Sequence, residues 1–433
     1  MNFEKNPQIH NKICTIWKYN SMKPIKNILL VSMFAAAFNA QASPITLGAD
    51  LVGLTVFSHT ETSTGANSIV HGSMLGGDVT STGANAVVHG DVTSVNATNI
   101  GGGKSVVNGD VVSGGVLTVG GATGGTLPGP AVTGSITSTD ASTIGAFAQI
   151  GGDMLSGGVA TTGADSLVGG SVRADGAATT GDNGDVTGDV WSGDFATIGA
   201  NSNIGGNVDG VGANVISANG ASVGSQTDVT DPPDLSAVRT DVDAESQQVT
   251  DAQTDLFNLG FGTPLSNTSA GAPVMVGDHS LAAGVYSAAS FSTTAGTTLT
   301  LQGDGTDNQS WVFNIADILA FGGTTNIVMD NVGKNASVYW NSYAGYITSG
   351  DGSNVIGTLL AHTYIMVGAN ATVMDVGTTC GAVYSATSYV TAGDTAVIGG
   401  KGCSAVSVPE PTSVLLFGLG LFGLAGLARR KKV

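Results

Sequence analysis

Glycine recurs at a fixed interval in the first half of this chain, and that interval constrains the fold more than any other feature. The clearest run is spaced by 18 residues and comprises Gly145, Gly163, Gly181 and Gly199. Short apolar segments alternate with Gly, Asn and Asp, which are residues that favour turns. A repeat of about 18 residues with such short segments predicts a three-sided β-solenoid, in which each coil stacks on the next.

The composition agrees with an all-β fold. Of 433 residues, 66 are Gly, and only 11 % are charged and 6 % aromatic. Gly weakens helix interiors, while a hydrophobic content of 42 % argues against disorder. We expect Gly, Asn and Asp at the coil corners, where the backbone needs positive φ. Stacked apolar side chains should fill the interior, namely Val70, Val88, Val107, Ile150, Val168 and Ile204.

The charge distribution excludes one class of partner. The net charge is −18, and residues 44–407 hold five basic residues against 30 acidic ones. Affinity for nucleic acid comes from Lys and Arg that neutralise phosphates. We therefore expect no nucleic-acid partner.

One segment has a helical pattern. After Asp231-Pro-Pro-Asp234, residues 235–259 carry apolar side chains at steps of three, four and seven, which predicts an amphipathic helix. Asp234 or Ser236 can cap its start, and Gly260 should end it. We expect this helix to lie along the solenoid. The predicted organisation is a first solenoid block at 43–230, a linker with the helix at 231–260, and a second block at 261–407.

The N-terminal residues 1–42 have the pattern of an export signal. Lys23 and Lys26 precede an apolar stretch, and small residues end it at Ala42. This pattern predicts a secretory signal peptide cleaved after Ala42, with the Sec machinery as a transient partner and Met22 as the true start.

The C-terminal residues 408–433 combine three elements. Pro409-Glu410-Pro411 precedes an apolar run at 413–428, and a basic tail follows. The order resembles the PEP-CTERM sorting signal of Gram-negative bacteria. That resemblance implies export across the inner membrane, transient anchoring through 413–428, cleavage by an exosortase, and a cell-surface or extracellular location. The alternative is a plain membrane anchor.

Motifs for chemistry are scarce, so we predict neither an enzyme nor a cofactor or metal. Cys380 and Cys403 form an even pair in an exported chain, which favours a disulfide over two unrelated thiols. Four acidic residues form a Gly-rich patch, for which a solvated face is favoured over Ca²⁺: Asp182, Asp185, Asp189 and Asp194.

The second half resembles the ice-binding-like adhesin family. The motifs are Leu281-Ala-Ala-Gly-Val-Tyr286, Leu299-Thr-Leu-Gln-Gly-Asp-Gly305, Trp311-Val-Phe-Asn-Ile315, Val338-Tyr-Trp-Asn341 and Val355-Ile-Gly-Thr-Leu-Leu-Ala361. The resemblance covers about 45–76 and 230–404. It implies a β-solenoid flanked by one long helix, and an ice-binding face with Thr-Ala/Gly-x-Thr/Asn motifs.

Two functions follow as hypotheses. The first is an exported, surface-sorted ice-binding (antifreeze) protein that adsorbs to ice through a flat Thr-rich face. Its candidate contacts are Thr294, Thr297, Thr391, Thr64, Asn67, Thr82 and Asn85. The alternative is a structural adhesin or biofilm-matrix protein that binds a surface or matrix polymer and has no ice activity.

Overall fold

The computed structural model describes residues 47–122, 129–210, 215–222, 233–265, 274–275, 277–377 and 380–400. The described residues all belong to one unit. The signal region, Cys403 and the sorting segment therefore lie outside the described residues.

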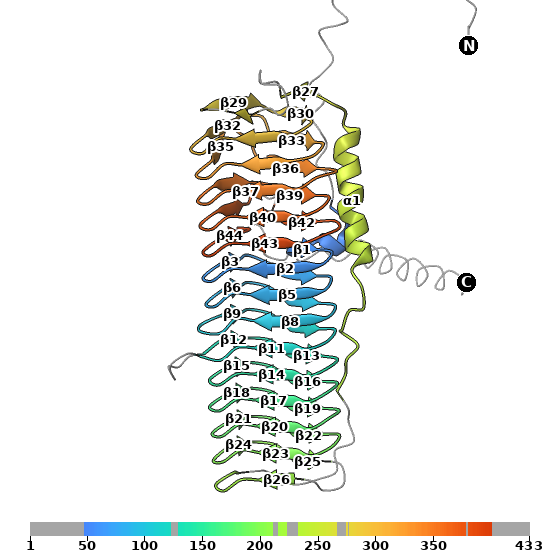
Figure 1. Ribbon diagram of the computed structural model, residues 1–433, viewed down its shortest axis with the longest axis vertical. Helices are drawn as coiled ribbons and strands as arrows, with labels where there is room; N and C mark the ends of the chain where they lie inside the picture. The colour runs from blue at the N-terminus through green and yellow to red at the C-terminus, as the bar shows by residue number, and fades with distance from the viewer. Residues whose placement is uncertain are drawn as a thin grey trace, which may run out of the picture. The chain divides into compact units, whose positions relative to one another are not determined.

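Three parallel sheets run along the molecule, and each coil contributes strands to sheets A, B and C in turn (Figure 1). Sheets A and B have 15 strands each, and sheet C has 14. This arrangement confirms the predicted three-sided β-solenoid.

Sheet A is the face beside the helix. Its strands, in spatial order, are β25 (Val208–Gly210), β22 (Val190–Ser192), β19 (Val172–Ala174), β16 (Met154–Ser156), β13 (Ile136–Ser138), β10 (Val111–Ser113), β7 (Val92–Ser94), β4 (Ser73–Gly76), β1 (Leu54–Ser58), β42 (Val383–Ser385), β39 (Thr358–Ala361), β36 (Ser337–Ser342), β33 (Ser310–Ile315), β30 (Gly284–Ala288) and β27 (Thr263–Pro264).

Sheet B follows sheet A in each coil. Its strands are β26 (Val215–Ser217), β23 (Ala196–Ile198), β20 (Ala178–Thr180), β17 (Ala160–Thr162), β14 (Ser142–Ile144), β11 (Leu117–Val119), β8 (Ala97–Ile100), β5 (Val79–Thr82), β2 (Glu61–Thr64), β43 (Val390–Ala392), β40 (Ile365–Val367), β37 (Ile347–Ser349), β34 (Leu319–Phe321), β31 (Phe291–Thr293) and β28 (Val274–Met275).

Sheet C completes each coil. Its strands are β24 (Asn203–Ile204), β21 (Asp185–Val186), β18 (Leu167–Val168), β15 (Gln149–Ile150), β12 (Ala131–Val132), β9 (Val106–Val107), β6 (Val87–Val88), β3 (Ile69–Val70), β44 (Val397–Ile398), β41 (Thr372–Met374), β38 (Asn354–Ile356), β35 (Asn326–Asp330), β32 (Thr298–Gln302) and β29 (His279–Ala282).

Two blocks of coils, which the sequence could not place relative to each other, form one continuous solenoid. We call residues 47–222 the first block and residues 263–400 the second block. At the seam between them, β1 pairs with β42, β2 with β43 and β3 with β44, all in parallel. The buried Tyr384 hydroxyl donates a hydrogen bond to the Leu54 carbonyl across this seam, at 2.7 Å. The first and last described coils are therefore neighbours in the middle of the solenoid (Figure 1).

The interior is apolar, as the sequence predicted. All six residues expected to stack inside are at most 2 % exposed. The first block fills its core mainly with Val, Ile and Ala. The second block adds stacked aromatic rings: Phe313 lies 4.0 Å from Trp340 and 5.3 Å from Tyr286 between ring centroids.

The repeating glycines have a different cause from the one expected. The residues that adopt a left-handed backbone conformation at these corners are mainly Asn. Asn67, Asn85 and Asn183, for example, have φ of 56°, 58° and 55°. Gly83 does not have a positive φ, but a Cβ there would lie 2.3 Å from the Gly65 carbonyl carbon. Glycine is needed because neighbouring coils approach too closely for a side chain, so the expectation of positive φ was wrong for these glycines.

The flanking helix is present but shorter than predicted. Helix α1 spans Asp243–Asn258, and the short 3-10 helix η1 (Ala49–Leu51) contacts it. Residues 235–242, predicted as its first turns, instead precede the helix, and Leu235 packs beside Gly157 of the first block. The Asp234 carboxylate accepts the Ser236 backbone N–H in a local turn, which lowers the pKa of Asp234. Gly260, with φ of +97°, follows the helix end as predicted.

Helix α1 covers sheet A of the second block. Val249, Ala252 and Leu256 pack against a cluster that includes Phe57 and Tyr384. Polar side chains of sheet A also contact the helix backbone.

Two buried asparagines attach the helix to the sheet. The Asn314 amide donates to the Leu256 carbonyl at 2.7 Å, and the Asn341 amide donates to the Gln253 carbonyl at 3.0 Å. The Asn341 amide also donates to the Asn314 side-chain oxygen at 2.9 Å. Since these groups are buried, the hydrogen bonds fix both the position and the register of α1.

Candidate functional site

The outer face of sheet B carries a regular row of hydroxyls. We define the threonine row as Thr118, Thr143, Thr161, Thr179 and Thr197. Each is the central residue of its strand and is in register with the next across β11, β14, β17, β20 and β23. The flanking residues of each strand are buried, so the central Thr points outward. Each of these coils therefore presents one methyl and one hydroxyl group, and the groups repeat at the spacing of neighbouring strands.

A second row runs beside the first. We define the apolar row as Val116, Ala141, Val159, Ala177 and Phe195. Each lies two residues before a threonine of the threonine row, and its backbone carbonyl accepts an N–H of the preceding coil. Val116, Val159 and Phe195 are 47 %, 43 % and 41 % exposed, Ala141 is half-buried, and Ala177 is buried at 9 %. Sheet B therefore presents apolar and hydroxyl groups side by side.

In the second block, tyrosines continue the apolar row. We define the tyrosine ladder as Tyr346, Tyr364 and Tyr389, which precede β37, β40 and β43. Their rings stack with centroid distances of 4.5 Å and 5.0 Å. Partial burial, followed by the neighbouring phenols of Tyr346 and Tyr389, raises the pKa of Tyr364. Three consecutive rings form a ridge here, whereas the apolar row of the first block has Val, Ala and the single ring of Phe195.

The two rows on sheet B are almost free of charge. The positions in register with these rows run along sheet B from Ser292 in the second block to Ile216 in the first. Among the described residues at these positions, Glu61 is the one charged side chain.

Carboxylates lie at the corners of the coils instead: Asp140 and Asp194 precede strands of sheet B, Asp165 and Asp182 follow them, and others lie between sheets C and A. The Asp residues between sheets C and A bind the backbone. There Asp110, Asp153 and Asp189 accept backbone N–H groups of the next coil at 2.7–2.8 Å. The acidic residues thus border sheet B at its corners but are nearly absent from the two rows of outward positions.

Three of the predicted contact residues are buried, which corrects the prediction for them. Thr64 and Thr82 are each 6 % exposed and Thr297 is 1 % exposed. The Thr82 hydroxyl accepts the Gly101 backbone N–H of the next coil at 3.1 Å. In the Thr-Gly-Ala-Asn motif the Thr points inward and stabilises the corner, so it cannot contact an external surface.

The other predicted contacts lie on or beside sheet B. Thr391 points outward from β43 in register with Ser63, and so continues the line of the threonine row. Asn67 and Asn85 are exposed at the corner between sheets B and C, where the Asn85 amide donates to the Asn67 side-chain oxygen at 3.3 Å. Thr294 is half-buried after β31, with its hydroxyl 3.0 Å from that of Thr297.

The Asp patch does not come together. Asp182 accepts the Ala200 N–H at one corner, Asp189 accepts the Asn207 N–H at another, and Asp185 lies on sheet C. Among the described residues, no group of three or more His, Cys, Asp or Glu side chains could hold a metal ion. Cys380 is disulfide-bonded, while its expected partner Cys403 lies outside the described residues, so that pairing stays a prediction.

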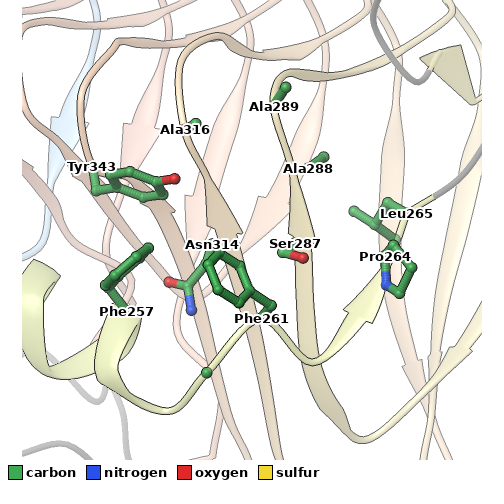
Figure 2. Close-up of a pocket in the computed structure, with 11 residues that line it drawn as sticks. Phe257, Phe261, Pro264, Leu265, Ser287, Ala288, Ala289, Asn314, Ala316 and Tyr343 are labelled. Carbon is green, nitrogen blue, oxygen red and sulfur yellow. The ribbon is translucent and has the colours of Figure 1, made fainter. Parts of the chain in front are cut away.

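A cavity of about 490 Å³ lies at the end of α1 on the sheet A side (Figure 2). Phe257, Phe261 and Tyr343 contribute aromatic rings to its lining. Among the described residues, no helix is both long enough and apolar enough to cross a membrane. The apolar run 413–428 lies outside that part of the chain.

Comparison with known proteins agrees with this architecture. The sequence model of the ice-binding-like family matches residues 172–398, which is more than half of the chain and includes α1 and the second block. The chain belongs to the ice-binding-like family. The match begins at Val172, so it also takes in the last coils of the first block, beyond the range expected from the sequence motifs.

Two further comparisons concern the C-terminus and the fold. The PEP-CTERM protein-sorting motif matches residues 407–432 and contains Pro409, Glu410 and Pro411; it implies export and cell-surface sorting. A crystal structure of an ice binding protein from an Antarctic bacterium, Flavobacteriaceae, is 14 % identical, with a TM-score of 0.27, over 82 % of this chain and 97 % of that chain. No curated protein matches.

The sequence contained a signal for the threonine row that was missed. Each of its threonines lies two residues before a glycine, as in Leu117-Thr-Val-Gly120 and Ala196-Thr-Ile-Gly199. The residues on either side of the Thr are small or apolar and point inward. The alternation therefore identifies the outward position, whereas the Thr directly before Gly points inward.

Proposed function

We propose that this member of the ice-binding-like family adsorbs to ice through the outer face of sheet B, and that it is sorted to the cell surface. The observation that carries the proposal is the threonine row, where five Thr side chains follow one another in register over five coils. Repeated methyl and hydroxyl groups at fixed spacing can order water into an ice-like layer.

Low charge and accessibility support the choice of sheet B. A carboxylate or ammonium group would hold its own hydration shell, and sheet B has Glu61 alone at its outward positions among the described residues. The outer face of sheet A is covered by α1 in the second block. Sheet C has strands of only two residues in the first block. Thr391 extends the proposed face, while Asn67, Asn85 and Thr294 lie along its border.

The proposal assigns no reaction and needs no cofactor. The alternative, an adhesin or matrix protein whose coils polymerise end to end, has less support. Pro264 occupies the edge strand β27 at the second-block end. Proline lacks the backbone N–H that a further strand would need, so it hinders addition of another coil there.

The test compares matched charge insertions on two faces of the same coils. Thr143→Lys/Thr161→Lys places two ammonium groups on sheet B, and the control Gln149→Lys/Leu167→Lys places two on sheet C. Thermal hysteresis and inhibition of ice recrystallisation would be measured on residues 43–407. We expect the sheet B variant to lose most activity and the sheet C control to keep it. An unmodified protein that behaves like an inert protein control would overturn the proposal.

A further inference from the structure

The tyrosine ladder and the threonine row lie on the same sheet but in different coils. The threonine row runs from β11 to β23 in the first block, whereas the tyrosine ladder lies beside β37, β40 and β43 in the second. Each tyrosine lies two residues before the outward residue of its strand, as the apolar row does in the first block. The same position in the coil therefore holds a large ring in one block and mostly Val or Ala in the other.

The stacked rings of the ladder cannot lie flat on the sheet. Tyr364 stacks between Tyr346 and Tyr389, with interplanar angles of 11° and 8° and centroid distances of 4.5 Å and 5.0 Å. These distances match the spacing of neighbouring strands, about 4.8 Å. Rings that lay flat on neighbouring strands would meet edge to edge and would not be stacked, so the rings stand edge-on to the sheet. Stacking on both faces holds Tyr364 in this position.

The outward row of the second block is also irregular. Ala320, Thr348, Met366 and Thr391 follow one another in register, and Met366 is 44 % exposed. A hydroxyl group therefore recurs only in every second coil here, whereas the threonine row has one in every coil. The second block lacks the regular repeat on which the proposed ice contact depends.

Glu61 lies at the boundary between the two kinds of surface. Thr62 pairs with Val390, so the residues before them, Glu61 and Tyr389, lie on neighbouring coils. The exposed Glu61 side chain therefore follows the last ring of the ladder directly. A charged group holds its own hydration shell, so this position suits the border of an ice-contacting surface and not its middle.

The surface on the other side of Glu61 is low and regular. Its outward row carries a hydroxyl or amide group in every coil from Ser63 to Thr197. Beside that row, six consecutive coils before Phe195 hold only Val or Ala, namely Val79, Ala97, Val116, Ala141, Val159 and Ala177. Along these two described rows, no aromatic ring stands out between the ladder and Phe195.

We propose that the tyrosine ladder ends the ice-binding face at the coil of Thr391, so that adsorption depends on the first block. A crystal face of ice is flat and rigid, and upright rings beside Thr348 and Met366 hold it away from the outward row of the second block. This inference rests on the proposed function and narrows it to one part of sheet B. The family model covers the second block but begins only at Val172 in the first. The proposal therefore assigns much of the ice contact to coils outside that match.

The first test moves the ladder into the first block. Val116→Tyr/Ala141→Tyr/Val159→Tyr places three tyrosines on neighbouring coils beside the threonine row and adds no charge. Thermal hysteresis would be measured on residues 43–407, and circular dichroism would confirm the fold. We expect the variant to lose most of the thermal hysteresis of the unmodified protein. A variant that keeps it would overturn the proposal.

The matched control places the same rings on another face. Ala131→Tyr/Gln149→Tyr/Leu167→Tyr puts three tyrosines on neighbouring coils of sheet C. We expect this control to keep its thermal hysteresis. An equal loss in the control would mean that added rings act without regard to the face, which would also overturn the proposal.

The second test leaves the ladder intact and changes the outward row. Thr348→Lys/Met366→Lys places two ammonium groups on neighbouring coils of the second block, matched to Thr143→Lys/Thr161→Lys in the first. We expect only the first-block variant to lose activity, and equal losses would overturn the proposal. An unmodified protein without thermal hysteresis would instead contradict the proposed function, and the inference with it.

Discussion

The two blocks share three continuous sheets but use them differently. In the first block, the core is lined by residues such as Val172, Val190 and Val208, and the outer face of sheet B carries the threonine row. In the second block, Trp340 and Phe313 fill the core, α1 covers sheet A, and the tyrosine ladder stands on sheet B. The difference shows that one pattern of strand pairing accommodates different core and surface side chains, so the outward rows can take separate roles in the two blocks.

The largest expected effect distinguishes the two cores. Trp340→Ala removes a fully buried ring that stacks on Phe313 and contacts Phe321. We expect a loss of about 3–5 kcal/mol in the free energy of unfolding. Val190→Ala in the first block should cost about 1–2 kcal/mol, because it removes only two buried methylene equivalents.

Urea unfolding followed by circular dichroism would measure both variants. Equal losses would contradict the view that the second block depends on large aromatic side chains while the first depends on many small ones.

A smaller effect concerns the helix that only the second block carries. Asn341→Ala removes two buried hydrogen bonds, to the Gln253 carbonyl and the Asn314 side chain. Because it leaves those acceptors buried without this donor, we expect a loss of about 2–4 kcal/mol. Faster amide hydrogen exchange in α1 should accompany the loss.

The matched control is Asn354→Ala on sheet C, where a half-buried amide donates to Asn326 at 2.9 Å. We expect about 0.5–1.5 kcal/mol there, with exchange in α1 unchanged. If both variants left the helix protected, the buried asparagines would not be what holds α1 in place.

The smallest effect is a pH dependence at the seam. The His71 and His89 rings stack with centroids 5.0 Å apart. Burial, followed by repulsion from His89, lowers the pKa of His71, while Asp375 partly opposes the shift. The folded state therefore binds protons less readily than the unfolded state, so stability is complete above the unfolded pKa of about 6.5 and falls as the pH drops below it.

Melting temperatures at pH 7.5 and pH 5 would test this sign. His71→Asn should reduce the decrease in Tm between the two pH values by a small amount. A larger decrease in the variant would mean that protonated His71 stabilises the fold.

Much of the architecture could be predicted from the sequence because it depends on local repetition. The 18-residue period determines the coil, and residues such as Val70 and Ile150 were correctly placed inside. The start of α1 was predicted too early, because residues 233–242 keep an apolar pattern while packing on the first block. The pairing of β1 with β42 could not be predicted, since it joins residues more than 300 positions apart.

The candidate face was the hardest part to predict. The repeated Thr-Gly-Ala-Asn motif drew attention to Thr64 and Thr82, whose side chains turned out to be buried. Thr64 and Thr82 lie one residue after the strand position that the threonine row occupies in other coils. Only the alternation of inward and outward residues distinguishes the two positions. A shift of one residue along a strand moves a side chain from the solvent face to the core face. The Thr of the repeated motif was therefore assigned to the solvent face although it lies in the core.

The central claim is that the threonine row on sheet B adsorbs to ice, and removal of whole coils tests it most directly. Deletion of residues 163–180 removes one coil with Thr179, and deletion of 145–180 removes two coils with Thr161 and Thr179. The repeat allows each deletion to rejoin equivalent positions. We predict that thermal hysteresis falls with each coil removed while the far-ultraviolet circular dichroism per residue stays the same. Unchanged thermal hysteresis after both deletions would contradict the account.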